Sequence, residues 1–244
     1  MSAGPRVAIV TGGSSGIGLA CGRLLVERGY DVVLTARRED VLREAAASIG
    51  ARYAAGDSAD EDAFASVVAN AGRVDLLVHA AGVMDGTFVR KETASTFDSV
   101  IRTNLRSAFV VTAAALPVMP EGGRIIFLSS SSAHAPQPGK AAYSASKAGL
   151  NAFASALSRE VDRDGINVHV ITTGPVATPM LEDVHFPMLA LNADDIAKAV
   201  VFLDELPPNV SLFELEINSV EKGPFAPKPF VPEAAKKLGR TELP

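Results

Sequence analysis

Cysteine, tryptophan and long apolar stretches are scarce in this chain of 244 residues. With one cysteine, Cys21, the chain forms no internal disulfide, which fits a reducing compartment. No apolar run approaches the roughly 20 residues that a membrane-spanning helix needs. The first six residues, Met1–Arg6, lead into a strand without the long apolar segment of a secretion signal. We therefore expect a soluble cytoplasmic protein in which Cys21 is a buried structural thiol.

The excess of one charge over the other is also small. The formal net charge is −5 and is spread along the chain, so no basic surface for nucleic acid or for anionic lipid is expected. The expected partner is a small molecule, and we expect no metal site. Apolar residues make up 48% of the sequence, which is enough to build the core of one large domain.

Apolar segments of strand length alternate with segments of helical period. The expected strands are 7–10, 32–35, 53–55, 76–79, 124–128, 166–171 and 213–217, and the expected helices are 17–28, 39–49, 60–71, 95–119, 142–161 and 193–203. This alternation predicts an α/β fold: a single-domain, doubly wound (Rossmann-like) sheet of about seven mostly parallel strands with helices on both faces, over residues 1–222.

Prolines and glycines dominate the sequence after Val220. They predict an extended C-terminal tail over residues 223–244, with one short helix near 233–238. The tail is expected to be disordered or to pack on a neighbouring subunit.

A glycine-rich turn follows the first strand and opens the first helix. Glycines at this point let the backbone approach a pyrophosphate, and the helix N-terminus offers free N–H groups to it. The spacing differs from the commoner G-x-G-x-x-G fingerprint, but the strand–turn–helix context still predicts a dinucleotide cofactor. The expected contacts are Gly12, Ser14, Ser15, Gly16, Ile17 and Gly18.

The end of the second strand indicates which dinucleotide binds. An acidic residue there would bind the ribose hydroxyls of NAD, whereas arginine accommodates the 2′-phosphate of NADP. The sequence has Arg37 and Arg38 at this point and no acid before Glu39. Because a guanidinium group suits a phosphate, we expect NADP(H).

Tyr143 and Lys147 are four residues apart on one predicted helix and therefore share a face. A nearby ammonium is expected to lower the pKa of a tyrosine, which can then exchange a proton with a carbonyl or alcohol oxygen. Ser130, after the fifth strand, can donate a hydrogen bond to the same oxygen. Each signal alone is weak. Their joint position at the carboxyl edge of the sheet predicts oxidoreduction of carbonyl or alcohol groups.

These motifs resemble those of the short-chain dehydrogenase/reductase family, in its short, single-domain NADP-dependent branch, over roughly residues 6–220. The TGxxxGxG element matches Thr11–Gly18, the YxxxK element matches Tyr143–Lys147, and a serine thirteen positions before the tyrosine selects Ser130. The resemblance implies that Asn104 holds a water of a proton relay and that Lys147 also binds the nicotinamide ribose. It implies further cofactor contacts at Asp57, Ser58, Ala80, Ala81, Gly82, Pro175, Val176 and Thr178. It also implies a homo-tetramer or homo-dimer, in which the two long helices pair between subunits.

The sequence departs from the family pattern at three places. After the sixth strand, the family has Pro-Gly where this chain has Thr173-Gly174-Pro175. Where the family has Asn-Asn-Ala-Gly, this chain has His79-Ala80-Ala81-Gly82, and His79 is expected to be a core histidine bonded to backbone. Only residues 179–192 separate Thr178 from the next helix, so the substrate lid is short. A short lid favours an open site, a bulky substrate, or cover from the C-terminal tail. The residues considered for substrate contact are Met84, His134, Gln137, Met180, His185, Phe186 and Met188.

The leading hypothesis is an NADPH-dependent reductase of ketones or aldehydes that also runs in reverse. The substrate alternatives are a 3-oxoacyl thioester, a cyclic ketone, a steroid-like alcohol and an aldehyde. A second hypothesis is a non-catalytic nucleotide-binding regulatory module on the same fold. A third is epimerisation or dehydration in the same site.

Overall fold

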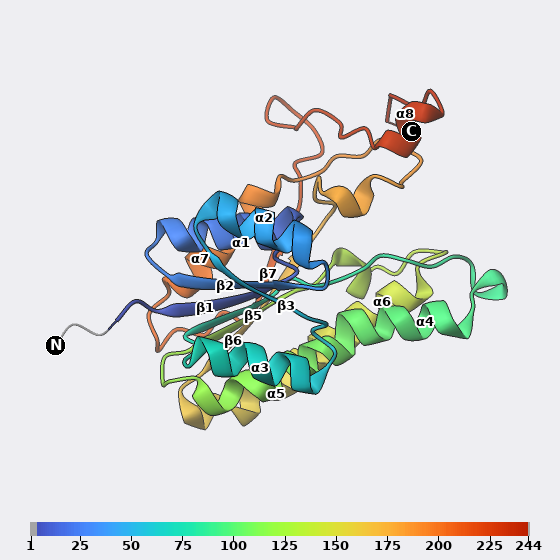
Figure 1. The fold of residues 1–244 in the computed structure, drawn as a ribbon. Helices are drawn as coiled ribbons and strands as arrows, with labels where there is room; N and C mark the ends of the chain where they lie inside the picture. Colours follow the sequence, from blue (N-terminus) through green and yellow to red (C-terminus); the bar gives the residue numbers. More distant parts are fainter. Residues whose placement is uncertain (1–3, 244) are drawn as a thin grey trace.

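A seven-stranded sheet forms the centre of the molecule (Figure 1). In spatial order its strands are β3 (Arg52–Ala55), β2 (Asp31–Ala36), β1 (Val7–Thr11), β4 (Leu76–His79), β5 (Arg124–Leu128), β6 (Asn167–Thr173) and β7 (Glu214–Ile217). Neighbouring strands are all parallel, which confirms the predicted doubly wound α/β fold. The structure, a computed structural model, describes residues 4–243, so residues 1–3 of the expected N-terminal lead-in and residue 244 lie outside it.

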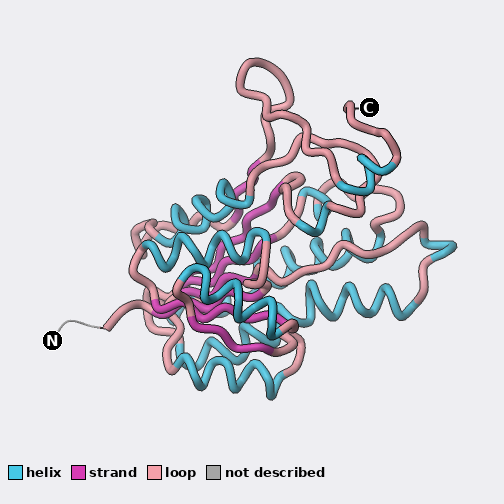
Figure 2. Tube along the Cα trace, turned by 45° about the horizontal axis from the view of Figure 1, so that its top comes forward, coloured by secondary structure: helices cyan, strands magenta, loops and turns pink. Residues whose placement is uncertain are grey.

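Helices cover both faces of the sheet, as Figures 1 and 2 show. One face carries α1 (Gly16–Glu27), α2 (Glu39–Ile49) and α7 (Ala193–Asp204), and the other carries α3 (Glu61–Ala71), α5 (Ser107–Ala115) and α6 (Ala141–Glu160). Successive strand residues point to opposite faces. In β1, Val10 packs in one apolar layer and Ile9 in the other. Strands buried on both faces explain the nearly continuous apolar segments in the sequence.

The order of the strands reverses between β1 and β4, since the chain builds outward from β1 to β3 and then returns to place β4 on the other side. In open α/β sheets, ligands bind outside the carboxyl ends of the strands at this point. The loops that follow β1, β4 and β5 therefore define where a site is expected.

The expected helix 95–119 is interrupted. It consists of α4 (Ala94–Ile101), a π-helical segment Arg102–Arg106, α5, and a 3-10 turn Leu116–Val118. The hydroxyl of Ser107 donates to the carbonyl of Thr103 at 2.5 Å within this region. A π-helical turn inserts one extra residue into an α-helix and is frequent at functional sites. Here it contains Asn104, which is fully buried.

The C-terminal tail packs on the lid of its own chain, so the expectation of a disordered tail is wrong, and contact of the tail with a neighbouring subunit stays a prediction. Met188 and Phe230 form an antiparallel bridge, with backbone hydrogen bonds of 3.0 and 2.8 Å. The backbone N–H of Ala234, in the short helix α8 (Glu233–Lys237), donates to the carbonyl of Glu182 at 3.0 Å. None of residues 223–243 lines the cavity at the carboxyl ends of the strands, so the three readings of the short lid stay predictions. Figure 1 shows the tail on the opposite side of the molecule from the N-terminus.

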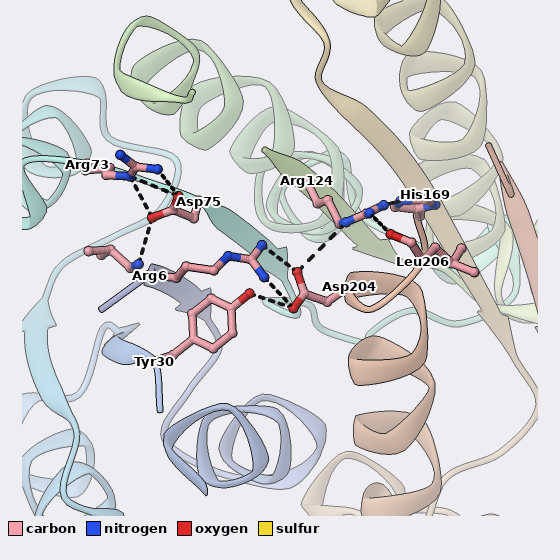
Figure 3. Close-up of polar contacts among 9 residues, drawn as sticks. Arg6, Tyr30, Arg73, Asp75, Arg124, His169, Asp204 and Leu206 are labelled. Carbon is pink, nitrogen blue, oxygen red and sulfur yellow. Dashed lines mark hydrogen bonds and ion pairs between the residues drawn. The ribbon is translucent and has the colours of Figure 1, made fainter. Parts of the chain in front are cut away.

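An ionic cluster ties α7 to the amino edge of the sheet, opposite the expected site (Figure 3). The buried carboxylate of Asp204 accepts two hydrogen bonds from Arg6, at 2.9 and 3.0 Å, and one from the hydroxyl of Tyr30 at 2.6 Å. The buried guanidinium of Arg124 lies 3.9 Å from the same carboxylate. Because these charges are paired and hydrogen-bonded, the cluster has a structural role. Among the described helices, none has the length and apolarity needed to cross a membrane.

Candidate active site

A cavity of about 720 Å³ opens at the carboxyl ends of the strands, where the strand order reverses. Nearly all the predicted site residues line it. They are Gly12, Ser14, Ser15, Gly16, Ile17, Gly18, Arg37, Arg38, Asp57, Ser58, Ala80, Ala81, Gly82, Ser130, Tyr143, Lys147, Pro175, Val176 and Thr178. Asn104 is the exception: it lies behind the wall, between the lining residues Thr103 and Ser107.

The glycine loop is shaped for close approach of a ligand to backbone. Gly12 has φ +67°, and a Cβ there would lie 2.9 Å from the backbone of Ala80 and Ala81. The N-terminus of α1 is uncapped, because Ser15 makes no side-chain capping bond and the first turn holds no acid. Its N–H groups are therefore free to bind an anion. The free N–H groups and the positive end of the α1 dipole suit a pyrophosphate.

Arg37 and Arg38 follow β2 and are exposed at the edge of the cavity. Partial burial raises the pKa of the neighbouring Asp57, but hydrogen bonds from Arg102 and from the backbone N–H of Ala59 outweigh it and hold that pKa below its usual value. Asp57 is thus an anion paired with Arg102. Two guanidinium groups without an ion-pair partner among residues 4–243 remain beside it.

Tyr143 and Lys147 lie on α6 and Ser130 lies on the turn after β5. The structure brings all three to the cavity wall. The Lys147 Nζ donates to the carbonyl of Leu128 at 2.7 Å and lies 5.9 Å from the centre of the Tyr143 ring. Both side chains are more than nine-tenths buried. A carbonyl placed at the Tyr143 hydroxyl would therefore be shielded from bulk water.

The expectation that Lys147 lowers the pKa of Tyr143 is not met. Burial raises the pKa of Tyr143, and only a hydrogen bond with Ser130 opposes that rise. Burial also lowers the pKa of Lys147 to about 8, because its ammonium has no acidic partner. The physical reason is that Lys147 is directed to the Leu128 carbonyl. At neutral pH the phenol of Tyr143 keeps its proton and can donate it.

Asn104 connects the loop after β4 to α6. Its Oδ1 accepts from the backbone N–H of Val83 at 2.8 Å, and its Nδ2 donates to the Val83 carbonyl at 2.9 Å and to Ser146 Oγ at 3.0 Å. The oxygen and the nitrogen of the Asn104 side chain are thus both hydrogen-bonded to protein atoms. Asn104 thereby fixes the loop that lines the cavity next to Lys147. A water relay through Asn104 stays a prediction.

His79 is a core histidine, but its partners are side chains and not backbone, which corrects the sequence expectation. Its Nδ1 lies 2.8 Å from Thr11 Oγ1 and its Nε2 lies 3.1 Å from Ser107 Oγ. Since Ser107 donates its own proton to the carbonyl of Thr103, Nε2 must carry the hydrogen and Nδ1 must accept from Thr11. Thr11 Oγ1 in turn accepts the backbone N–H of Ala81 at 3.0 Å. This chain of bonds holds the ends of β1 and β4 together behind the cavity.

Acid is expected to destabilise the protein through His79. Burial, with a smaller effect of Lys147, lowers its pKa to about 3. The unfolded chain takes up a proton near pH 6.5, whereas the folded chain takes up none until about pH 3, so stability falls as the pH falls through this window. Between pH 6.5 and 5 the loss from His79 is about 2 kcal/mol. Urea unfolding of the wild type and His79→Leu at both pH values measures it: the variant should lack this loss, and parallel losses would contradict the assignment.

The residues considered for substrate contact divide into two groups. Met84, Gln137, Met180, Phe186 and Met188 line the cavity. His134 and His185 do not, which corrects that expectation.

His134 is turned toward β7, because its Nε2 pairs with Glu214 Oε1 at 2.8 Å. Sequence reasoning also missed several lining residues, namely Val83, Lys140, Leu181 and Val184. For Lys140 a signal was present, since it lies only three residues before Tyr143 in the sequence.

Comparison with known proteins agrees with this geometry. Residues 6–186 match the family model described as short chain dehydrogenase. The chain is 36% identical over 219 residues to a 3-oxoacyl-[acyl-carrier-protein] reductase of Bos taurus, covering 83% of this chain and 92% of the relative. It is 37% identical over 197 residues to an acetoacetyl-CoA reductase of Cupriavidus necator, covering 75% of this chain and 80% of the relative.

A solved structure described as BdcA in complex with NADPH is also similar. It superposes with a TM-score of 0.80 at 30% identity, covering 88% of this chain and 93% of that one. The match of the family model covers most of the chain, and the relatives are aligned over most of their own length. The chain therefore belongs to the short-chain dehydrogenase/reductase family of oxidoreductases.

Proposed function

We propose that this protein is an NADP(H)-dependent oxidoreductase that reduces a ketone or aldehyde to an alcohol, reversibly. One observation carries the proposal. A single cavity holds an uncapped glycine loop suited to a pyrophosphate at one end and the buried group of Tyr143, Ser130 and Lys147 at the other. The acid–base group thus lies where the reactive end of a dinucleotide bound along this cavity would lie.

The proposed roles follow from the atoms on the cavity wall. Tyr143 donates the phenolic proton to the carbonyl oxygen of the substrate, and Ser130 donates a hydrogen bond to the same oxygen as negative charge develops on it. The ammonium of Lys147 lies 5.9 Å from the centre of the Tyr143 ring, and the resemblance assigns it to the nicotinamide ribose. Asn104 positions the loop beside Lys147. The nicotinamide cofactor, when bound, supplies or accepts the hydride.

The electrostatics favour the reductive direction near neutral pH. Because burial raises the pKa of Tyr143, the free protein holds this residue as an acid that is ready to donate. Oxidation of an alcohol needs the phenolate instead, which forms at higher pH. We therefore propose reduction as the main reaction at neutral pH.

The preference for NADP(H) is proposed to rest on Arg37 and Arg38. The solved relative in complex with NADPH supports this choice of cofactor. Replacing both arginines with alanine is expected to weaken NADPH binding by roughly 10- to 100-fold and to leave NADH binding nearly unchanged, because only NADPH carries the 2′-phosphate. Titrations of both nucleotides followed by nucleotide fluorescence measure this.

The matched control is Arg43→Ala, an exposed arginine on α2 that does not line the cavity. It should bind both nucleotides as the wild type does. If the Arg37→Ala/Arg38→Ala protein bound NADPH as tightly as the wild type, the two arginines would not select the cofactor. Equal binding of NADH and NADPH by the wild type would count against NADP(H) preference itself.

A second candidate substrate class is the 3-oxoacyl thioester. The names of the two similar reductases, one for 3-oxoacyl carrier protein and one for acetoacetyl-CoA, favour it. A non-catalytic nucleotide-binding module is disfavoured because Tyr143, Lys147 and Ser130 all reach the cavity. Epimerisation or dehydration would leave no net oxidation of NADPH, so the absorbance of NADPH during turnover separates it from reduction.

We also propose that the protein forms a homo-dimer or homo-tetramer in the cytoplasm. Phe109 on α5 and Phe97 on α4 are 54% and 41% exposed, which suits burial against another subunit. A monomeric mass in solution scattering would refute the assembly. Cys21 is a buried free thiol, as suits a reducing compartment.

A further inference from the structure

The part of the cavity next to the lid is lined by apolar side chains together with uncharged polar ones such as Gln137 and Thr173. The cofactor part lies over β3, β2, β1 and β4, and the remaining part lies over β4, β5 and β6, next to the lid. Its apolar lining includes Val83, Met84, Leu181, Val184, Phe186 and Met188. Such a lining accommodates the apolar body of a substrate but offers no group that recognises a charge.

One cation interrupts this lining. The charged residues at the cavity wall are Arg37, Arg38, Asp57, Lys140 and Lys147. The first three belong to the cofactor part, and Lys147 donates to the Leu128 carbonyl. Lys140 is the remaining charge on the described wall, and it lies in the substrate part.

Lys140 has no acidic partner. No carboxylate among residues 4–243 lies within 4.0 Å of its ammonium. The acids of the neighbouring loop are engaged elsewhere, since Glu92 accepts the backbone N–H of Thr87 and Asp85 accepts that of Gly86. Partial burial lowers the pKa of Lys140, and no carboxylate opposes that effect. A half-buried cation without a counter-ion is unfavourable in the free protein, so a bound anion would stabilise it.

The position of Lys140 relative to the proton donor fixes where that anion would lie. Lys140 directly precedes α6, and its carbonyl accepts the backbone N–H of Ser144 at 2.8 Å, so it lies one turn before Tyr143, and both residues line the same cavity. A substrate oxygen bonded to Tyr143 would place an anionic group at Lys140 only if the two groups are a few bonds apart. The phosphates of a long thioester arm would lie farther from the reacting carbonyl.

From this arrangement we infer that the substrate is a keto acid, with an apolar body on the lid and a carboxylate a few bonds from the carbonyl that binds Lys140. This inference rests on the proposed reductase function and specifies its substrate class. Lys140 is a specificity residue in it and takes no part in proton transfer.

The test compares an acid with its neutral ester. The probes are 4-oxopentanoate and 4-oxo-4-phenylbutanoate, each beside its methyl ester, with NADPH as the reductant. The wild type is expected to prefer the acid over the ester in kcat/KM by roughly tenfold or more, through KM, as one charged hydrogen bond would produce. Lys140→Met should bring this ratio close to one, Lys140→Arg should keep it, and Lys140→Glu should invert it.

Control variants separate Lys140 from a general effect of charge. Lys198→Met removes an exposed lysine of α7 that pairs with Asp195, and it should keep the wild-type ratio. An acid-to-ester ratio near one in the wild type, or a ratio unchanged by Lys140→Met, would overturn the inference. So would a Lys140→Met protein that loses turnover of acetoacetyl-CoA while it keeps its preference for the keto acid, because the cation would then serve a thioester.

A binding experiment separates failure of this inference from failure of the proposed function. Calorimetric titration of 4-oxo-4-phenylbutanoate and its ester into the protein with NADP⁺ measures the same ratio without turnover. If neither compound is reduced but the acid binds at least tenfold tighter and Lys140→Met removes that difference, the keto acid site holds and the reductase proposal fails. If the ester is reduced while the acid shows no advantage in binding or turnover, the reductase proposal holds and the keto acid site is refuted.

Discussion

Tyr143→Phe is expected to lower kcat for carbonyl reduction by roughly 100- to 10,000-fold, the range that a positioned general acid contributes. The substitution removes one hydroxyl from a side chain that is 7% exposed and leaves its ring packing in place. Because the phenol is the proposed proton donor, the loss should appear in kcat, and NADPH affinity should change little. Steady-state kinetics and nucleotide fluorescence titration of the same protein preparation measure the two quantities.

The matched control for this substitution is Tyr53→Phe. Tyr53 lies on the edge strand β3, is 39% exposed and does not line the cavity. Its hydroxyl should be dispensable for turnover. Substantial turnover by Tyr143→Phe would show that another group donates the proton, and the role assigned to Tyr143 would have to be withdrawn.

Lys147→Met is expected to make the protein more stable and nearly inactive. The folded state holds the ammonium with one hydrogen bond to the Leu128 carbonyl and no counter-ion, and burial lowers its pKa to about 8. At pH 7 the folded protein therefore carries a buried charge at a cost of about 1–3 kcal/mol, which methionine avoids. Turnover should fall about 100-fold or more, and NADPH binding should weaken, since the resemblance places Lys147 on the nicotinamide ribose.

The stability difference between Lys147→Met and the wild type is expected to depend on pH. Between pH 8 and about 10.5 the unfolded wild type binds more protons at Lys147 than the folded protein does, so wild-type stability rises with pH in this window. The stability advantage of Lys147→Met should shrink correspondingly. Denaturant unfolding without cofactor at pH 7 and pH 10 tests this. A variant that is less stable than the wild type at pH 7 would show that the buried ammonium stabilises the fold.

The sheet could be predicted because its signals are local. A strand buried on both faces has a nearly continuous apolar sequence, and β1 and β5 are buried throughout, with a polar residue only at one end of each, Thr11 and Arg124. Helix ends also carry local signals. Asp60 caps α3 by accepting the backbone N–H of Ala63, and Gly50 ends α2 with φ +72°.

The π-helical segment around Asn104 could not be predicted. One inserted residue changes which side chains face the core, but a sequence of mixed polar and apolar residues fits either helical period. The partners that hold Asn104 are Val83 and Ser146, which lie 21 and 42 residues away. Only the folded arrangement brings them together.

The site shows the same difference between features with local sequence signals and features that depend on residues far apart in the chain. The residues of the cofactor part lie in fixed motifs, and the structure places them in one cavity. The electrostatics depended instead on long-range contacts. The bond from Lys147 to Leu128 overturned an expectation that rested on local spacing, and the partners of the core histidine His79 are side chains where backbone was expected. The role inferred for Lys140 depends on the positions of the other charged residues of the cavity wall, which only the structure shows.

The central claim is that this cavity transfers a hydride to a carbonyl carbon while Tyr143 protonates the oxygen. It is tested most directly with NADPH that carries deuterium at both C4 positions of the nicotinamide and a panel of ketones, aldehydes and keto acids, analysed by mass spectrometry of the alcohols. The account predicts one deuterium at the carbinol carbon for each NADPH consumed, and almost no product with Tyr143→Phe. A protein that binds NADPH but yields no deuterated alcohol from any carbonyl of the panel would contradict the account.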